Sequence, residues 1–549
     1  MPDPVIVVGA GPVGLIAAMD LAWRDIPVIV LELRDDEAPA HPRCNTTSAR
    51  TMEILRRLGC NEKYRACGLA ADYPNDVTYS TGITGLEIAR LHLPSADAGV
   101  MADRVAHDGG WHSAERPHRA SQFYLERVLR EHALTFEEVD LRFCQEVIGV
   151  EQTDCAVNLK VRHTETGEVS TVTGSFVMGC DGGRSSVRKA CGIEMAGGYT
   201  GLGRNQSIVI RSKDIRPIME RHNGLAWMNW TINEAGRGNM IAIDGKDLWL
   251  THLSLMPDQE GVTPETIDRH VRAVVGQAIE YEVEHTETWQ LNRLVAERYR
   301  EGRVFLAGDA AHIWPPYAGH GMNTGIEDGV ALTWMLAAVW QGWAPMELLG
   351  AYEKERHNVG EKVSRAAEGL VIQQTKIWKS IEDIAVLRDP GEAGHELRRR
   401  IRNELVMTDS VQFNAQGMNF ALHYDESPVM EYDGGPPEYE IRNYTPSTVP
   451  GCRAPYFAFV EDGVPIFDRI GQGFALLRSD ESLDVSDMVE AAQSCGMPLQ
   501  VIDIEFEPRA RDFYDHALVL IRPDDRVAWR SNTLPEDPGA VIDKVRGAA

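Results

Sequence analysis

Three glycines near the N-terminus have the spacing of a turn that binds a dinucleotide phosphate. Gly9, Gly11 and Gly14 follow a short apolar run and precede a helical segment that begins near Pro12. In such a turn the first glycine permits the tight bend, the second lets a pyrophosphate approach the backbone, and the third lets the helix pack closely on the strand. The helix N-terminus then faces the negative charge. We therefore predict a bound dinucleotide, in preference to a glycine turn with a merely structural role.

Two carboxylates extend this site and distinguish FAD from NAD. Glu32 ends the second apolar run, 28–31, where a carboxylate accepts hydrogen bonds from an adenosine ribose. Asp309 follows the buried run 304–307, where it can bind a polyol chain such as ribityl, a group that NAD lacks. The glycine-rich segment 319–323 then opens a long helix, whose amides and positive end would stabilise an anionic reduced flavin. The pattern predicts FAD.

A third turn, Cys180 to Arg188, again joins the end of a strand to the start of a helix. With it, the order GxGxxG, DG and GD resembles the class A, single-component FAD-dependent aromatic hydroxylases, the family of para-hydroxybenzoate hydroxylase and phenol hydroxylase. Shorter matches extend the resemblance over nearly the whole chain: 41–43 (HPR), 50–53 (RTME), 119–126 (RASQFYLE), 424–428 (YDESP), 450–455 (PGCRAP) and 519–529 (VLIRPDDRVAW).

The resemblance implies roles for individual cofactor-binding residues. Arg43 would contact FAD near the mobile flavin, Gln122 would lie at the ribityl side, and Asp309 would bind the ribityl chain. Asp181 would hold in place a loop used for both FAD and the nicotinamide cofactor. The remaining residues are those of the ADP half (Gly9, Gly11, Pro12, Gly14 and Glu32) and those offering backbone amides to the isoalloxazine (Gly321, Met322 and Asn323).

Three candidate catalytic residues also follow from the resemblance. Pro316 lies where the family presents a backbone carbonyl to the substrate or flavin. His320 replaces the glutamine of a Gly-Gly-Gln-Gly segment and places a titratable group close to the flavin. Asn45 occupies a position where phenol hydroxylases can have an aspartate, and it cannot take a proton. The substrate base stays open among three residues that could equally be packed or exposed ones: His222, His252 and Tyr317.

The reaction implied is hydroxylation of a phenolic ring. FAD would be reduced by NADPH or NADH and would react with O2 to a flavin C4a-hydroperoxide, which transfers one oxygen atom to the ring. No second GxGxxG is present, which suits a nicotinamide that binds transiently. Two alternatives stay open: an FAD-dependent oxidase or dehydrogenase on the same fold, and a non-catalytic nucleotide-binding protein.

Aromatic residues between 190 and 285 indicate the kind of substrate. Trp227, Trp230 and Trp249 suggest a flat apolar pocket, although a β-sheet core would explain them equally well. No arginine is obviously poised for a carboxylate, so we expect a small neutral phenol. Three arginines nevertheless remain as potential partners of an acid: Arg211, Arg216 and Arg293.

These motifs require an α/β fold, a Rossmann-like FAD-binding domain interleaved with a β-sheet substrate domain, plus a C-terminal thioredoxin-like domain. Alternating segments in 190–285 predict a mostly antiparallel sheet. The C-terminal domain lacks CxxC and has only Cys495 on its helix, so we expect it to be structural or to contribute to a homodimer. The expected ranges are 1–75, 101–190 and 285–400 for the FAD-binding domain with a helical extension, 76–100 and 191–284 for the substrate sheet, 401–450 for a linker, and 451–549 for the thioredoxin-like domain.

Composition narrows the partners. Lys and Arg total 55 against 82 Asp and Glu, a net charge of −27, which disfavours nucleic acid and anionic membranes. The sequence contains no uninterrupted run of about 18 apolar residues, so we expect no transmembrane helix. No basic leader precedes the first strand, so we expect no signal peptide. The nine cysteines are scattered without a CxxC pair, which predicts no metal site and suits the cytoplasm. The run Arg398 to Arg400 is expected to be a solvated helix face.

Overall fold

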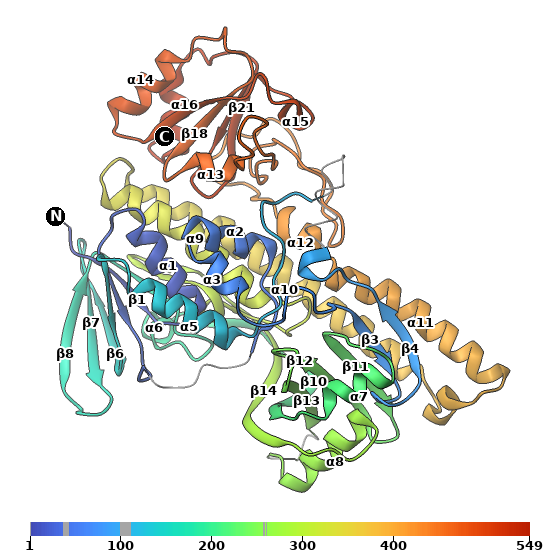
Figure 1. Cartoon of the computed structure of the whole chain (residues 1–549). Coiled ribbons are helices and arrows are strands. Elements are labelled where there is room, and N and C mark those ends of the chain that lie inside the picture. Colours follow the sequence, from blue (N-terminus) through green and yellow to red (C-terminus); the bar gives the residue numbers. More distant parts are fainter. Residues whose placement is uncertain (1, 37–42, 99–110, 256–258, 260) are drawn as a thin grey trace.

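The computed structural model describes residues 2–36, 43–98, 111–255, 259 and 261–549. His41 and Pro42 of the HPR match, and the predicted domain boundaries at 100 and 101, lie outside the described residues. The described part forms a central parallel sheet, a large substrate sheet, a small three-stranded sheet and a C-terminal domain (Figure 1).

The central sheet places all three predicted motifs at one edge. All its strands except β15 are parallel to one another, namely β16, β9, β1, β2 and β5, so their carboxyl ends lie together. The GxGxxG turn follows β1, Glu32 follows β2, Asp181 follows β9, and Asp309 comes shortly after β16. The strand order is β15 (Arg300–Glu301), β16 (Val304–Leu306), β9 (Phe176–Gly179), β1 (Val5–Val8), β2 (Val28–Leu31) and β5 (Val139–Arg142).

Two helices pack closely beside this edge. Helix α1 (Pro12–Ala22) lies against α9 (His320–Trp340), and both are buried along most of their length. Gly325 of α9 allows this approach, because a Cβ built on it would lie only 2.9 Å from Cγ2 of Val13 on α1. The long helix predicted from about Met322 to Trp340 is therefore confirmed, and it begins two residues earlier.

The substrate sheet has eight strands and is antiparallel except for the β11–β3 pair. Helix α8 (Pro264–Val275) covers one face, where His270 Nε2 lies 2.8 Å from Thr251 Oγ1. Strand β14 continues twelve residues beyond the predicted boundary at 284, to Ala296, and β17 belongs to this sheet. The order is β17 (His312–Ile313), β14 (Glu282–Ala296), β10 (Met195–Arg211), β13 (Leu248–Leu255), β12 (Gly236–Ala242), β11 (Met228–Asn233), β3 (Val77–Ser80) and β4 (Glu87–Leu91).

Helices connect the substrate sheet to the C-terminal domain. The long helix α10 (Leu349–Lys379) is followed by α11 (Glu392–Phe413) and α12 (Gln416–Phe420), so the first part of the predicted linker 401–450 is helical. Ile401 and Leu405 of α11 are buried in the core of the substrate sheet. The expectation of a solvated Arg398 is wrong: this buried side chain donates to the carbonyls of Leu387 and Asp389.

The C-terminal domain is a four-stranded sheet with flanking helices. A βαβ unit is followed by two antiparallel strands and a helix, in the sheet order β19-β18-β20-β21, as expected for a thioredoxin-like domain. In Figure 1 it lies above α2 (Ala49–Arg57) and α9, opposite the substrate sheet. Its elements are β18 (Phe474–Arg478), α14 (Ser486–Ser494), β19 (Leu499–Asp503), α15 (Pro508–Arg511), β20 (Leu518–Ile521), β21 (Val527–Ser531) and α16 (Pro538–Val545).

Buried ion pairs join this domain to the helices of the FAD-binding domain. Arg522 is fully buried and its two terminal nitrogens lie 2.7 and 3.0 Å from the carboxylate oxygens of Glu355 on α10. Arg50 on α2 lies 2.5 Å from an oxygen of Asp525. The segment 519–529, which carries part of the family resemblance, is therefore an interdomain contact.

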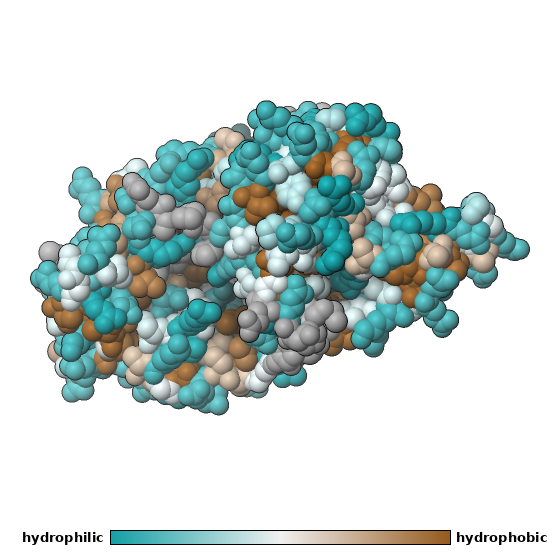
Figure 2. Space-filling model, turned by 90° about the horizontal axis from the view of Figure 1, so that it is seen from below, coloured by the Kyte–Doolittle hydropathy of each residue, from teal (hydrophilic) through white to brown (hydrophobic). Residues whose placement is uncertain are grey.

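Among the described residues, no helix is long and apolar enough to cross a bilayer. On the face seen from below in Figure 2, hydrophobic residues lie in separate groups among hydrophilic ones.

Candidate active site

The glycine turn after β1 has the geometry that a phosphate-binding turn requires. Gly9 adopts a φ of +102°, which favours glycine, and a Cβ built on Gly14 would lie 1.9 Å from the Gly9 carbonyl oxygen. A Cβ on Gly11 would meet nothing within 4 Å, so this residue borders open space. No side chain caps α1 and no acidic residue lies in its first turn. The free N–H groups of that turn therefore suit a pyrophosphate.

Glu32 is held at the end of β2 beside this turn. One carboxylate oxygen accepts the Ala10 backbone N–H at 2.7 Å, and the other accepts the Arg34 backbone N–H at 3.0 Å. The second of these oxygens, Oε1, also accepts from Arg34 Nε at 3.2 Å, so these bonds fix the direction of the carboxylate and leave an acceptor site on Oε2 for a ribose.

Asp309 lies on the exposed side of the turn after β16. Its side chain is 47% exposed and has no hydrogen-bond partner among the described residues; its nearest cation is Arg43, at 4.0 Å. Arg43 is itself held by Glu287 of β14 at 2.8 Å. An exposed carboxylate suits the predicted contact of Asp309 with the ribityl chain, and the neighbouring Arg43, predicted to contact FAD near the mobile flavin, is held close to it.

Asp181 is a structural residue of its loop. Its Oδ2 accepts the backbone N–H groups of Ser186 and Val187 at 2.7 and 3.2 Å, at the start of the short helix α6 (Ser186–Ala190). The predicted role of holding this loop is supported by these bonds. Gln122, at the start of α5 (Gln122–Ala133), donates its side-chain amide to Glu126 at 2.7 Å and its backbone N–H to the Cys44 carbonyl at 2.6 Å.

The start of α9 divides the predicted flavin-contacting residues into two groups. Gly321 and Met322 are partly exposed, with no acidic residue or side-chain cap in this turn, so their amides can face a ligand. Asn323 is buried instead. Its side chain accepts the Ser48 backbone N–H at 2.8 Å and donates to the Thr46 carbonyl at 3.1 Å. Only its backbone is left for a flavin.

The three candidate catalytic residues differ in exposure. Pro316 is exposed, and Asn45 is partly buried, with its Oδ1 3.5 Å from Thr46 Oγ1. His320 is buried, which lowers its pKa to about 4. It is therefore neutral at pH 7 and does not change charge there.

One row of side chains runs across the substrate sheet on the face away from α8. Register partners on neighbouring strands share a face. At one end of the row Glu287 binds Arg43, so the row begins beside the cofactor motifs. Its members, in strand order, are Glu287, Ser207, His252, Asn239, Trp230 and Tyr79.

Of the three candidate substrate bases, only His252 belongs to this row. Its Nδ1 lies 3.0 Å from the Asn239 side-chain amide, which donates to it, and burial lowers its pKa to about 4. His222 is exposed at the end of α7 (Ile215–Arg221). Tyr317 donates its hydroxyl to Gln374 at 2.7 Å, and burial raises its pKa, so it is a poor base.

A buried carboxyl behind Tyr317 was missed by sequence reasoning. Asp409 of α11 accepts hydrogen bonds from the Tyr79 hydroxyl and the Gln374 amide, the latter at 3.2 Å. Burial raises its pKa to about 6. The predicted linker 401–450 includes Asp409, and nothing in the local sequence indicates that this carboxyl is buried.

Asp409 gives folding stability a characteristic pH dependence. Its pKa in the folded protein is above the ordinary value, so the folded state binds the proton more strongly and stability falls as pH rises from about 4 to about 6. Asp409→Asn removes this dependence. We expect the stability of the variant relative to wild type to rise by about 3 kcal/mol between pH 4 and pH 7, measured by urea unfolding. A difference that does not vary with pH would contradict the assignment.

The three arginines considered as carboxylate partners already have partners. Arg211 lies 2.8 Å from Asp247 and 2.6 Å from Glu284. Arg216 pairs with Glu220, and Arg293 pairs with Glu361. None of the three is a free cation.

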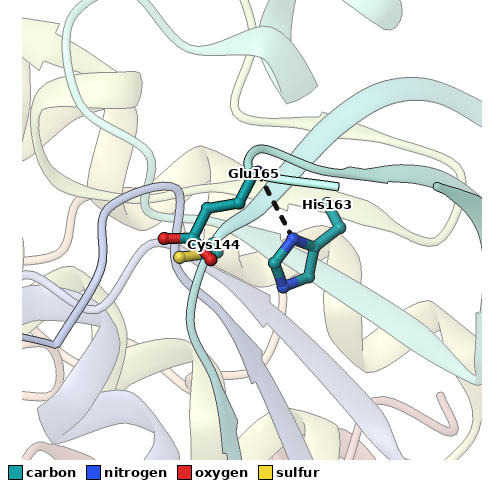
Figure 3. Close-up of side chains that lie close together, drawn as sticks. All are labelled: Cys144, His163 and Glu165. Carbon is teal, nitrogen blue, oxygen red and sulfur yellow. Dashed lines mark hydrogen bonds between the residues drawn. The ribbon is translucent and has the colours of Figure 1, made fainter. Parts of the chain in front are cut away.

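A cluster of potential metal ligands lies in the small sheet of β6 (Gln145–Gln152), β7 (Val157–His163) and β8 (Val169–Gly174). Cys144, His163 and Glu165 bring their side chains together there (Figure 3), although their spacing suggested no metal site. The His163 Nδ1 accepts the backbone N–H groups of Glu165 and Thr166 at 3.3 and 3.4 Å. These bonds belong to the β7–β8 turn, which accounts for the arrangement.

The fold, together with the geometry of the glycine turn, Glu32 and Asp309, defines a dinucleotide-binding flavoprotein. Its substrate sheet is separate from the sheet that carries these motifs. A family model described as "FAD binding domain" matches residues 3–367, and one described as "Aromatic-ring hydroxylase, C-terminal" matches 447–549. The chain belongs to the FAD-binding aromatic-ring hydroxylases. It is an FAD-dependent monooxygenase of aromatic substrates, and NAD(P)H is the reductant typical of the family.

Individual relatives cover nearly the whole chain. The FAD-dependent monooxygenase apdD of Emericella nidulans is 32% identical over 100% of this chain and 90% of its own length. The 4-methyl-5-nitrocatechol 5-monooxygenase of a Burkholderia species is 30% identical over 98% and 96%. The solved structure of the rebeccamycin biosynthetic enzyme RebC with reduced flavin superimposes with a TM-score of 0.87 at 31% identity, covering 100% and 99%.

Loss of the Asp309 carboxylate should weaken cofactor retention. A charge-assisted hydrogen bond contributes about 1.5–3 kcal/mol, so Asp309→Ala should raise the FAD dissociation constant about 10- to 150-fold. Titration of the apoprotein with FAD, followed by flavin fluorescence, measures this. The half-exposed Asp309 side chain contributes little to the stability of the fold. The Asp309→Ala apoprotein should therefore unfold at the same urea concentration as the wild-type apoprotein. If this variant bound FAD as tightly as wild type, the assignment of Asp309 to the ribityl site would be wrong.

Proposed function

We propose that this monooxygenase hydroxylates a phenolic ring, with NADPH or NADH and O2 as co-substrates. One observation carries the proposal: the sheet edge that gathers the three cofactor motifs adjoins the row Glu287 to Tyr79 on the substrate sheet. A ring bound against that row would lie beside the flavin. When bound, FAD supplies the oxygen chemistry, while the chain supplies position and a dry environment.

The cofactor would be held by the residues that the motifs single out. The glycine turn and α1 suit the pyrophosphate, Glu32 suits the ribose, and Asp309 with Arg43 suits the ribityl side. The remaining proposed FAD contacts are Gly9, Gly11, Pro12, Gly14, Gln122, Gly321, Met322 and the Asn323 backbone, with Asp181 holding its loop.

His252 is the proposed partner of the substrate hydroxyl. Because Asn239 donates to Nδ1, the proton of the neutral ring resides on Nε2, which can donate a hydrogen bond to a substrate oxygen. The low pKa keeps the ring neutral at pH 7, so it positions the hydroxyl rather than removing its proton. Pro316 and Asn45 are proposed to border the substrate, and His320 to border the flavin.

The test is a panel of phenols with purified FAD-loaded protein. The rate of NADPH and NADH oxidation is followed with and without each phenol, and the product is analysed by mass spectrometry. We expect stimulated oxidation and a product heavier by one oxygen atom. Stimulated oxidation without oxygen incorporation would indicate an oxidase or dehydrogenase. Bound FAD with no stimulation by any phenol would overturn the proposal.

A further inference from the structure

Arg119 is a cation whose guanidinium has no ion-pair partner among the described residues. Its terminal nitrogen donates to the Thr46 hydroxyl, and its guanidinium carbon lies 3.9 Å from the centre of the Trp227 ring. Arginines that are more deeply buried, such as Arg50 and Arg522, lie against carboxylates. Retaining a charge that is partly removed from solvent without a counter-charge is costly. An anion that arrives with a ligand would offset that cost.

The position of Arg119 is between the two halves of the active site. Thr46 adjoins the glycine-rich segment 319–323 at the start of α9, since a Cβ built on Gly319 would lie 3.2 Å from Thr46 Cβ. Trp227 directly precedes strand β11 of the substrate sheet and packs on Phe413, with ring centres 5.9 Å apart. The Arg119 guanidinium therefore lies where the start of α9 approaches the substrate sheet.

The remaining donors of Arg119 are available to a ligand. The residue is partly buried, one nitrogen is occupied by Thr46, and no other described residue accepts a hydrogen bond from it. Burial lowers its pKa to about 10, so it is still charged at pH 7. A guanidinium held over an indole ring keeps its other N–H groups for a ligand, and these donors match a carboxylate or another planar oxyanion.

We propose that Arg119 binds an anionic oxygen of the aromatic substrate, and that this enzyme therefore prefers rings that carry an ionised group over neutral ones. The inference rests on the proposed function and names its substrate class. It reverses the expectation of a neutral phenol, which rested on the tryptophans between 190 and 285 and on the lack of an arginine obviously poised for a carboxylate. The shared chemistry is an oxyanion, supplied either by a ring carboxylate or by an ionised ring hydroxyl.

The test compares matched acidic and neutral probes by their binding to the oxidised FAD-loaded enzyme, read from the change in flavin absorbance. The carboxylate arm compares 4-hydroxybenzoate with 4-hydroxybenzamide. The hydroxyl arm compares 2,4-dichlorophenol, at a pH where it is ionised, with 2,4-dichloroanisole. We expect wild type to bind at least one acid about 10-fold or more tightly than its neutral partner, as for a charge-assisted bond. The arm that shows the preference identifies the source of the oxyanion.

Variants then assign the preference to Arg119. Arg119→Met, which keeps an apolar side chain on Trp227, should remove the acid preference while neutral probes bind as before. Arg119→Lys should restore part of it. Arg211→Met removes an exposed, paired arginine of the substrate sheet and should leave the preference intact.

Three results would overturn the inference. They are a wild type with no preference in either arm, a preference that persists in Arg119→Met, and an Arg119→Met protein that loses FAD together with the preference, which would assign the residue to the flavin. None of them is a failure of the proposed function, because neutral phenols would still stimulate NAD(P)H oxidation and gain an oxygen atom. Conversely, an acid preference in binding without any oxygen insertion would reject the function and keep the subsite.

Discussion

Arg522→Met is expected to lower the free energy of unfolding by about 3–5 kcal/mol, because it leaves buried carboxylates without their cation. Arg522 binds both oxygens of Glu355 and both oxygens of Asp524, and its guanidinium carbon lies 4.9 Å from the centre of the Trp334 ring. Urea unfolding followed by circular dichroism measures the loss. Because the pair joins two domains, we also expect faster proteolysis near residues 427–455.

A surface pair provides the matched control for this substitution. Arg162→Met breaks an ion pair with Glu146 whose side chains are 48% and 37% exposed, and should change stability by less than about 1 kcal/mol. The double variant Arg522→Met with Glu355→Leu should recover part of the loss, since it removes one unpaired carboxylate. Equal stability of Arg522→Met and Arg162→Met would show that the interdomain pair contributes nothing.

Two alanine substitutions in the glycine turn should separate folding from cofactor binding. In Gly14→Ala the new Cβ would lie 1.9 Å from the Gly9 carbonyl oxygen, so α1 must move away from β1. We expect the apoprotein to lose about 3 kcal/mol or more of stability and to fail to bind FAD.

Gly11→Ala meets no such obstacle. Its Cβ would have no neighbour within 4 Å, and its φ of −73° suits alanine. The apoprotein should therefore unfold like wild type, whereas FAD affinity should fall at least about 10-fold, because the methyl group occupies the side from which the pyrophosphate approaches. Calorimetry of the apoproteins and FAD titration distinguish the two variants. Unchanged FAD affinity in Gly11→Ala would contradict a pyrophosphate at this turn.

The cofactor side was predictable from sequence because its signals are local. Gly9, Glu32 and Asp309 each end a short buried strand, and parallel strands bring their carboxyl ends together whatever the rest of the fold does. The C-terminal sheet was recognised for a similar reason, since each of its strands is a separate apolar run.

The substrate side was not predictable, because its properties arise from contacts between distant segments. Arg119 matters through Thr46 and Trp227 and through the lack of a carboxylate, none of which a local pattern contains. Asp409 is buried only because α11 packs on the substrate sheet. The prediction for Asn323 concerned only its backbone amide, and the role of its side chain in holding the Thr46–Ser48 segment depends on contacts that no local pattern contains.

The interdomain ion pairs also bear on how the chain is made. Glu53 of α2 pairs with Arg453, and Glu355 pairs with Arg522, so acidic groups of the earlier domain wait for cations synthesised 400 and 167 residues later. Glu53 can bind Arg50 and Ser113 before Arg453 is synthesised, but Glu355 and the surface around Trp334 lack Arg522 until that residue leaves the ribosome. The nascent FAD-binding domain therefore passes through a long stage in which the surface that will face the C-terminal domain is uncovered, and incompletely folded chains that expose apolar surface tend to aggregate. Release of the chain before Arg522 would yield a product prone to aggregation.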